Sequence, residues 1–419
     1  MNRLQWLAYH FFSLETFLVL FLYAAHLKAL LPPTPVPETL FYGVISLAIG
    51  AWIVLREGIY RGGLPIVIAG LVLTAWMVAS YGWSPSRTLA RESLPFVLGI
   101  NLWALFAAAC IVAGSRERVL RFLLLLMLVA AVLGAVGSYI YIVHGDFRFY
   151  RGAYGEWHHR TYLAWGNTAM SGAAVALALT LYARFGSLKQ LAAAAVFLCC
   201  LYFLLISGAR GALLGALLAG VAAVLTTPPR VQDGHITMPR AQILGLVLAG
   251  IAVVYFGYLI ASGQSPTTMS RFLRFFDQAD DPLLRGGANR FDYYFGAYQA
   301  WLAAPVFGHG LSGFATFFCG YDQPGCHPHN IFLQSLADHG LIGGILLVIP
   351  IALGLRNFKP ASLRDDPLRR AVMMTFVTIL VYAMVAAELP TAHRFFFFVG
   401  LLALRPPPPD TPADIEDDD

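Results

Sequence analysis

Charged residues are scarce in this chain. Only 12% of its 419 residues are Asp, Glu, Lys or Arg, whereas 58% are hydrophobic, and a soluble domain usually carries about 25% charged residues. Lysine is almost absent, with Lys28, Lys189 and Lys359 as the only examples. The basic residues are scattered between apolar runs and form no soluble basic domain, which excludes nucleic acid as a partner. The balance excludes an ordinary soluble protein and indicates a membrane-embedded chain.

A cleavable signal peptide is also missing. The first apolar run begins close to Met1, is long and aromatic, and lacks a small-residue cleavage site, so we expect it to remain as a helix. Apolar runs of about 18 to 25 residues recur, which is the length that crosses a hydrocarbon core as a helix. The sequence therefore predicts an all-α polytopic membrane protein with about 12 transmembrane helices. The expected spans are residues 10–31, 38–55, 64–80, 96–113, 119–143, 163–183, 189–205, 209–226, 241–261, 330–354, 369–388 and 392–405.

Lysine and arginine are unevenly divided between the two sides of this predicted bundle. With the N-terminus inside, 16 fall on the inner side and 12 on the outer side, and four of those 12 lie in one long loop that the orientation rule excludes. A cytoplasmic N-terminus is therefore predicted. We expect transmembrane helices 1–9 in residues 1–261, a long periplasmic loop with short helices in 262–329, transmembrane helices 10–12 in 330–405, and a disordered acidic cytoplasmic tail in 406–419.

The long loop contains two aromatic segments. Behind a cap at Asn289, helical spacing predicts an aromatic helix at the membrane surface, formed by Phe291, Tyr294, Phe295, Tyr298, Trp301 and Leu302. The segment SRFLRFFDQ, residues 270–278, is expected to be a shorter interfacial piece or a simple lipid anchor.

The cysteines fall into two groups. Cys110, Cys199 and Cys200 lie in apolar spans and are expected to be inert packing residues. Cys319 and Cys326 bracket the turn-rich stretch GYDQPG in the external loop. In an oxidising periplasm they are predicted to form a disulfide that would rigidify the approach to His327 and His329, with two free thiols as the alternative.

Cationic and imidazole groups gather in the external loops. They are Arg148, Arg151, His158, His159, Arg160, Arg210, Arg290, His309, His327 and His329. Arginine donates two parallel hydrogen bonds and stays charged when partly desolvated, so it suits a diphosphate. Arg210 lies between two apolar spans that almost no loop joins, and an ionisable residue so close to the membrane is a functional candidate. Contact of any one arginine with lipid phosphates remains an alternative.

The segment HPHNIFLQSLADHGLIGG leads from the long loop into the tenth span. Pro328 is in position to open a helix, which would place His329 at its mouth, where the imidazole can accept a proton from an attacking sugar hydroxyl. Asn330 and Gln334 lie four apart on one helical face and are expected to hydrogen-bond the sugar or its carrier. Asp338 and His339 are expected to form a buried interhelical polar contact.

Two other classes of function are less well supported. A metal site could combine His327 and His329 with His309 or with His158 and His159, but no carboxylate stands at a ligand spacing, so no metal and no cofactor are expected. A transporter of lipid-linked glycan would need ionisable residues near the midplane of several spans and internal repeats, and neither is evident.

These motifs resemble the O-antigen ligases of the O-antigen ligase and polymerase superfamily. His329 and Asn330, followed after nine residues by Gly340 and then Gly343, match the signature His-[Asn/Ser/Gln]-x9-Gly-x2-Gly. The stretch SGARG around Arg210 and the segment RFDYYFGAYQAWLAAPVFGHGLSGF from Arg290 are also similar to that family. His339 departs from the pattern, because an acidic or small polar residue is expected there in much of the family.

The resemblance implies a glycosyltransferase-C-like fold in the inner membrane of a Gram-negative bacterium, with a periplasmic active site. It implies metal-independent, inverting transfer of O-antigen from undecaprenyl diphosphate to lipid A-core. By position, His329 would act as the base or orient the acceptor. The diphosphate would be held by Arg210, Arg290 and, by placement alone, Arg160; substrate would also contact Arg148, Arg151, His327, Asn330 and Gln334. An O-antigen polymerase or a protein O-oligosaccharyltransferase would use the same carrier, and the sequence leaves that choice open.

Overall fold

The computed structural model describes residues 12–144 (except 29, 31–33 and 35), 161–182, 187–225, 230–232, 235–237, 243, 290–359, 362–363 and 366–407. Several predictions concern residues outside these ranges. They are the ninth span apart from Ile243, the segment 270–278, the tail beyond residue 407, Arg148, Arg151, His158, His159, Arg160 and Asn289.

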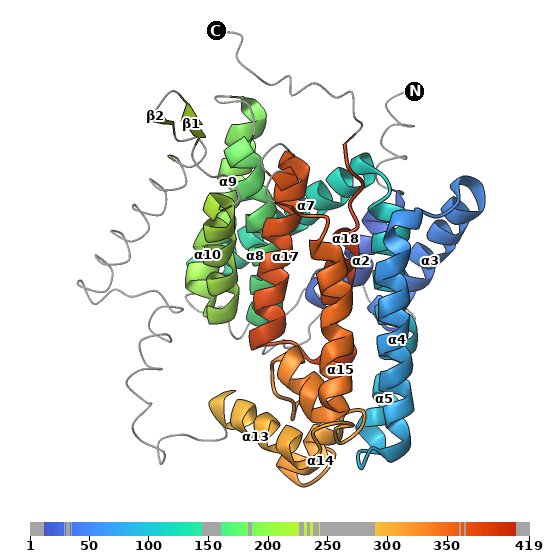
Figure 1. Ribbon diagram of the computed structural model, residues 1–419. Helices are drawn as coiled ribbons and strands as arrows, with labels where there is room; N and C mark the ends of the chain where they lie inside the picture. Colours follow the sequence, from blue (N-terminus) through green and yellow to red (C-terminus); the bar gives the residue numbers. More distant parts are fainter. Residues whose placement is uncertain are drawn as a thin grey trace.

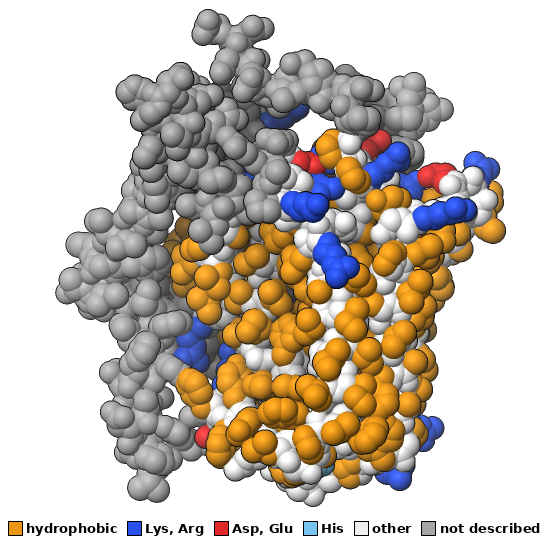
Figure 2. Space-filling view, viewed as in Figure 1, with side chains coloured by type: hydrophobic (Ala, Val, Ile, Leu, Met, Phe, Trp, Pro, Cys, Tyr) orange, Lys and Arg blue, Asp and Glu red, His pale blue; other side chains and the backbone are white. Residues whose placement is uncertain are grey.

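Long apolar helices build the bundle. They are α2 (Leu14–Leu27), α3 (Glu38–Glu57), α4 (Leu64–Ser80), α7 (Arg116–His144), α8 (Thr161–Tyr182), α9 (Leu188–Ser207), α10 (Arg210–Leu225), α15 (Ile331–Leu355), α17 (Pro367–Val385) and α18 (His393–Leu401). Within the described residues, seven helical stretches are long and apolar enough to cross a membrane. Apolar side chains cover most of the described bundle surface on the face seen in Figure 2, as a hydrocarbon surrounding requires. The protein is therefore a polytopic membrane protein, and the total of about 12 spans stays a prediction.

The fourth predicted span is longer and less regular than expected. It begins at Thr88 rather than at residue 96 and passes through α5 (Thr88–Pro95), the π-helix η3 (Phe96–Asn101), α6 (Leu102–Phe106) and the π-helix η4 (Ala107–Val112). Pro95 has no backbone N–H, so it disturbs the regular hydrogen-bond ladder where η3 begins. The extension places α5 at the end of the bundle where α13 and α14 lie (Figure 1).

Several short elements complete the chain. Three are 3₁₀ turns, η1 (Arg61–Gly63), η2 (Tyr81–Trp83) and η6 (Leu389–Thr391). The strands β1 (Arg230–Gln232) and β2 (His235–Thr237) form an antiparallel hairpin that the all-α prediction did not include. Strands of three residues are too short to show an alternating pattern in the sequence.

The helix α13 (Arg290–Ala303) confirms the aromatic helix predicted in the long loop. It crosses below α15 together with α14 (Gly313–Cys319) (Figure 1). Its inner face is made of the small buried residues Gly296, Ala297 and Ala300. The opposite face is exposed and apolar, with Phe291, Phe295, Tyr298 and Leu302.

The tenth predicted span is interrupted at Gly340. This residue has φ 66° and ψ −166°, so α15 consists of two helical pieces that meet at a kink. The backbone of the preceding loop replaces the broken intrahelical bonds, because His309 N donates to Ala337 O at 3.0 Å and Leu341 N donates to Pro305 O at 2.8 Å. The prediction of one continuous helix over 330–354 is therefore wrong at this residue.

Ion pairs hold the other end of the bundle together. Arg116 donates from both terminal nitrogens to the Asp366 carboxylate at 2.7 Å. The buried Glu15 carboxylate lies 3.5 Å from Arg121. Lysine and arginine side chains are concentrated at this end of the surface in Figure 2. The bundle therefore has one end rich in basic groups, and the candidate site lies at the opposite end.

Candidate active site

The HPHN segment begins α15 in a different way from the one predicted. Asn330 has an extended backbone and caps the helix, with its Oδ1 accepting hydrogen bonds from Phe332 N at 3.0 Å and Leu333 N at 3.1 Å. The helix therefore starts at Ile331, and Pro328 is buried outside it. The prediction that Pro328 opens the helix is wrong, because the asparagine side chain satisfies two of the free N–H groups at the helix start.

His329 is positioned by contacts from two directions. Its φ is 56°, an uncommon conformation for a residue with a Cβ and one that is found at functional sites. The ring lies edge-on to Tyr293 of α13, with centroids 5.6 Å apart, and to His327, with centroids 4.2 Å apart. His329 is half-buried, so the imidazole is ordered by its neighbours and still reachable from outside.

His327 is a neutral neighbour. Burial, together with the charges of His329 and Arg290, lowers the pKa of its imidazole to about 3. Its Nδ1 is buried and has no hydrogen-bond partner within the described part of the chain. At neutral pH His327 can therefore offer hydrogen bonds but no positive charge to a substrate.

Three arginines lie on elements that meet the last turns of α17. Arg290 begins α13, and Tyr294, one helical turn later, donates to Met384 O at 3.3 Å. Arg210 is exposed at the start of α10, where Gly211 is so close to α17 that a Cβ would lie 2.9 Å from Val385 Cγ2. Arg394 of α18 donates from Nη2 to Tyr382 Oη at 3.2 Å and lies over that ring. The structure thus brings Arg210 and Arg290 to neighbouring elements and adds Arg394, which the sequence did not single out.

A disulfide joins Cys319 to Cys326, with their Cα atoms 6.7 Å apart. The loop that it closes is also tied to α5, because Asp322 Oδ2 accepts from Thr88 N at 2.9 Å. Burial acts to raise the pKa of the Asp322 carboxyl, but hydrogen bonds from Ser86, Thr88 and Thr316 lower it overall. The disulfide loop, residues 319–326, is therefore fixed on both sides immediately before His327.

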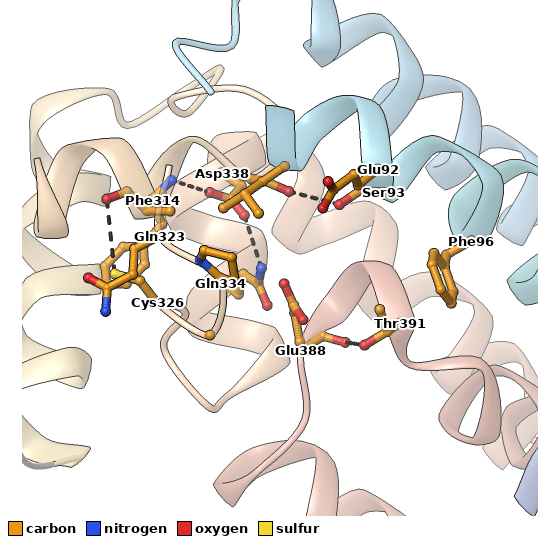
Figure 3. Close-up of a pocket in the computed structure, with 15 residues that line it drawn as sticks. Glu92, Ser93, Phe96, Phe314, Gln323, Cys326, Gln334, Asp338, Glu388 and Thr391 are labelled. Carbon is orange, nitrogen blue, oxygen red and sulfur yellow. Dashed lines mark hydrogen bonds between the residues drawn. The ribbon is translucent and has the colours of Figure 1, made fainter. Parts of the chain in front are cut away.

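A cavity of about 190 Å³ lies between α5, the disulfide loop, the first half of α15 and the turn η6 (Figure 3). Three carboxyl groups line it, Glu92, Asp338 and Glu388. The remaining lining residues are Leu89, Ser93, Phe96, Ser312, Phe314, Ala315, Gln323, Pro324, Gly325, Cys326, Gln334 and Thr391. No lysine, arginine or histidine is among them, so the cavity is acidic although cationic groups lie nearby.

The predicted buried contact at Asp338 and His339 is present. Asp338 is fully buried and accepts hydrogen bonds from Phe314 N at 2.8 Å and from Gln334 Nε2 at 3.2 Å. His339 Nδ1 lies 3.0 Å from Ser80 Oγ of α4. Gln334 Oε1 accepts from Leu389 N at 2.7 Å, so this side chain joins α15 to η6. Asp338 and Gln334 thus form the inner wall of the cavity.

The carboxylates and imidazoles are spread around the site. In the part of the chain that the structure describes, no three His, Cys, Asp or Glu side chains are close enough to hold a metal ion. The groups present are suited to hydrogen bonding, proton transfer and anion binding.

Residues 195–348 match the model of the O-antigen ligase family. The family resemblance seen in the motifs is thereby confirmed. This O-antigen ligase segment runs from α9 into α15 and contains Arg210, Arg290, His327 and His329. No curated protein matches the chain.

Sequence reasoning missed three residues outside the O-antigen ligase segment. Glu92, Glu388 and Arg394 belong to this end of the bundle but are far from His329 along the chain. No spacing motif connects residues that are brought together by helix packing alone, so a scan for local patterns could not have grouped them.

Proposed function

We propose that this protein is an O-antigen ligase that transfers O-antigen polysaccharide from undecaprenyl diphosphate to lipid A-core. The observation that supports this most is the fixed position of His329, between Tyr293 and His327, inside the O-antigen ligase segment. In this proposal the site faces the periplasm from the inner membrane of a Gram-negative bacterium, and both termini are cytoplasmic.

The proposed reaction is a single displacement with inversion at the anomeric carbon of the donor. A hydroxyl oxygen of lipid A-core forms a bond to that carbon while the bond from the carbon to the diphosphate oxygen breaks. The hydroxyl proton passes to the His329 imidazole, and undecaprenyl diphosphate leaves with the electron pair. Each step uses groups of the protein and the two substrates, and no metal ion is required.

Arginine side chains stabilise the leaving group in this scheme. Arg290 is exposed at the start of α13, on the same side as His327, and its charge acts on that imidazole. Arg210 begins α10 beside the end of α17. A diphosphate that gains charge as the bond breaks is held more tightly by guanidinium groups in the transition state than in the ground state. Arg160, Arg148 and Arg151 are proposed to assist from the segment before α8.

Transfer by purified protein tests this function directly. Wild-type protein, with undecaprenyl-diphosphate glycan, lipid A-core and a chelator, is expected to form the ligated product. Loss of the base typically slows such a reaction by about 10²- to 10⁴-fold, so His329→Ala should leave little product. Arg290→Ala and Arg210→Ala should each reduce the rate by about 10²-fold or more. Product is measured by the mobility shift of lipid A-core on gels and by mass spectrometry.

A matched variant at an exposed position controls for general damage. Arg56→Ala in α3 removes an exposed arginine at the end of the bundle opposite the site. It is expected to retain wild-type transfer, and all variants should insert into the membrane normally. Normal turnover by His329→Ala would contradict the proposed base. Folded protein that lengthens the glycan on its carrier but never modifies lipid A-core would instead be a polymerase.

A further inference from the structure

The acidic cavity has no role in binding the diphosphate. Its three carboxyl groups come from separate parts of the chain, Glu92 from α5, Asp338 from α15 and Glu388 from the residue before η6 (Figure 3). No cationic side chain lines it. A phosphate group placed here would meet carboxylates without a compensating charge, and like charges at short range are costly in a partly desolvated site. The ligand of this cavity is therefore not an anion.

Two polar groups in the cavity wall have unused hydrogen-bonding capacity. Gln334 is only 2% exposed, and its Nε2 carries two hydrogens, of which one is donated to Asp338. The second has no acceptor within the described residues. The Glu388 carboxylate extends beside Gln334 (Figure 3) and has no hydrogen bond to a described residue, although its backbone oxygen accepts from Thr391. Buried polar groups are nearly always paired, so the remaining Gln334 hydrogen, beside the half-buried Glu388 carboxylate, points to a polar ligand.

The pKa of the Glu388 carboxyl group agrees with these contacts. Burial raises it, and no described group of the protein lowers it in return. A ligand that donates hydrogen bonds to this carboxylate would supply what the protein lacks.

Size and apolar contacts limit what the ligand is. A volume of about 190 Å³ is smaller than the cavities of roughly 300–1,000 Å³ that enclose drug-sized ligands, so it takes a single ring and not a chain. Phe96, Phe314 and Leu89 provide apolar surface beside the polar groups. A ring with hydroxyl groups on its edge and C–H groups on its face matches this combination of carboxylates, amide and aromatic side chains.

We propose that this cavity is a binding site for one uncharged sugar ring of the acceptor, held by its hydroxyl groups on Glu388, Glu92 and Gln334. The assignment rests on the proposed function, because it makes the cavity the acceptor end of the transferase site. Cys326 lines the cavity and His327 follows it directly in the chain, so the cavity wall ends one residue before the imidazole pair. The acceptor ring at this site carries no phosphate or carboxylate group.

Saturation-transfer NMR on the full chain in nanodiscs tests the proposal. Nanodiscs are needed because maltoside detergents carry the sugar rings under test. Methyl α-D-glucopyranoside and methyl α-D-galactopyranoside are the uncharged probes, and glucose 6-phosphate is the anionic probe. At least one uncharged probe should receive saturation, and the anionic probe should not.

Two variants locate the binding. Glu388→Gln keeps the shape of the side chain, and Gln334→Leu removes the amide. Each variant is expected to weaken binding of the uncharged probe by about fivefold or more. Glu117→Gln, at an exposed carboxylate of α7, is the matched control and should bind as wild type. Inorganic pyrophosphate at saturation should leave probe binding unchanged, because its site is elsewhere.

The outcome separates this inference from the proposed function. Three results would overturn the sugar site even if lipid A-core is modified normally. They are equal probe binding by wild type and Glu388→Gln, displacement of the uncharged probe by pyrophosphate, and stronger binding of glucose 6-phosphate than of the uncharged probes. If probe binding depends on Glu388 but the protein never modifies lipid A-core, the sugar site is supported and the proposed ligase function is rejected. Because Gln334→Leu also removes a link between α15 and η6, Glu388→Gln is the deciding variant if the leucine variant misfolds.

Discussion

His329 and Glu388 depart from ordinary behaviour in different ways. His329 has a backbone conformation that is unfavourable for any residue with a Cβ, and Glu388 has a half-buried carboxylate with no partner among the described residues. Each feature costs stability, of order 1–3 kcal/mol for a strained backbone conformation. Residues that lower stability are kept where the reaction needs them, and both lie at the same end of the bundle.

The half-buried carboxyl group of Glu388 should make the stability of the protein depend on pH. Its pKa is raised above 4.5 by burial. Below that value the group is protonated in both folded and unfolded chains, so it contributes no difference. As pH rises through the raised folded pKa, the unfolded chain ionises more easily and the fold loses stability. Glu388→Gln should therefore unfold at a higher temperature than wild type at pH 8, and the gap should close towards pH 4.5.

Intrinsic-fluorescence melting in nanodiscs, repeated across this pH range, measures that difference. Glu117→Gln should follow wild type throughout, because its carboxylate is exposed. A Glu388→Gln variant that is less stable than wild type at pH 8 would show that the protein already stabilises the charge.

His327 should remain neutral well below the usual range for histidine. Burial, His329 and Arg290 lower its pKa to about 3, whereas an unfolded chain takes up the proton near pH 6.5. Folding stability from this residue is therefore present above pH 6.5 and is lost as the pH falls towards 3. In protein with ring-labelled histidine, assigned with His327→Gln, the His327 signal should keep its neutral shift at pH 5. A midpoint near 6.5 would contradict the buried, unpaired position of Nδ1.

At the scale of elements, the interruption of α15 is stabilised by the loop that precedes α14. Gly340 has a positive φ, and a Cβ there would lie 2.2 Å from Val306 O. The loop of residues 305–310 packs against the kink. The backbone N–H groups of His309 and Gly310 donate hydrogen bonds to the carbonyl oxygens of Ala337 and Asp338. Both glycines of the signature are therefore required by packing, since a Cβ at Gly343 would lie 2.2 Å from His339 Cβ.

Gly340→Ala should destabilise the protein by about 2 kcal/mol or more, because the left-handed conformation and the backbone contact both act against a methyl group. Gly99→Ala is the matched control, since a Cβ at this position in η3 meets nothing within 4 Å. The melting temperature should fall for Gly340→Ala and stay near wild type for Gly99→Ala. Equal melting of the two variants would show that the kink relaxes without loss.

For the molecule as a whole, the sequence predicted features that depend on local patterns and could not predict those that depend on long-range packing. The α3, α4 and α7 helices lie close to the predicted spans because each has an uninterrupted apolar window. The kink at Gly340 and the presence of Glu92 and Glu388 in one cavity depend on segments far apart in the chain. His329 could be found from a local motif, whereas its neighbour Tyr293 and the acidic cavity required the fold.

The boundaries of the O-antigen ligase segment have a consequence for how substrate preference can change. Residues 195–348 supply His329, Arg290 and Arg210, while Glu92 and Glu388 lie outside that segment, one on each side of it. Gln334 and the disulfide loop, which also line the cavity, lie inside it. Under the proposed assignments, exchange of the central stretch between relatives would change the donor contacts and one wall of the acceptor cavity together, so the two specificities are expected to evolve in concert.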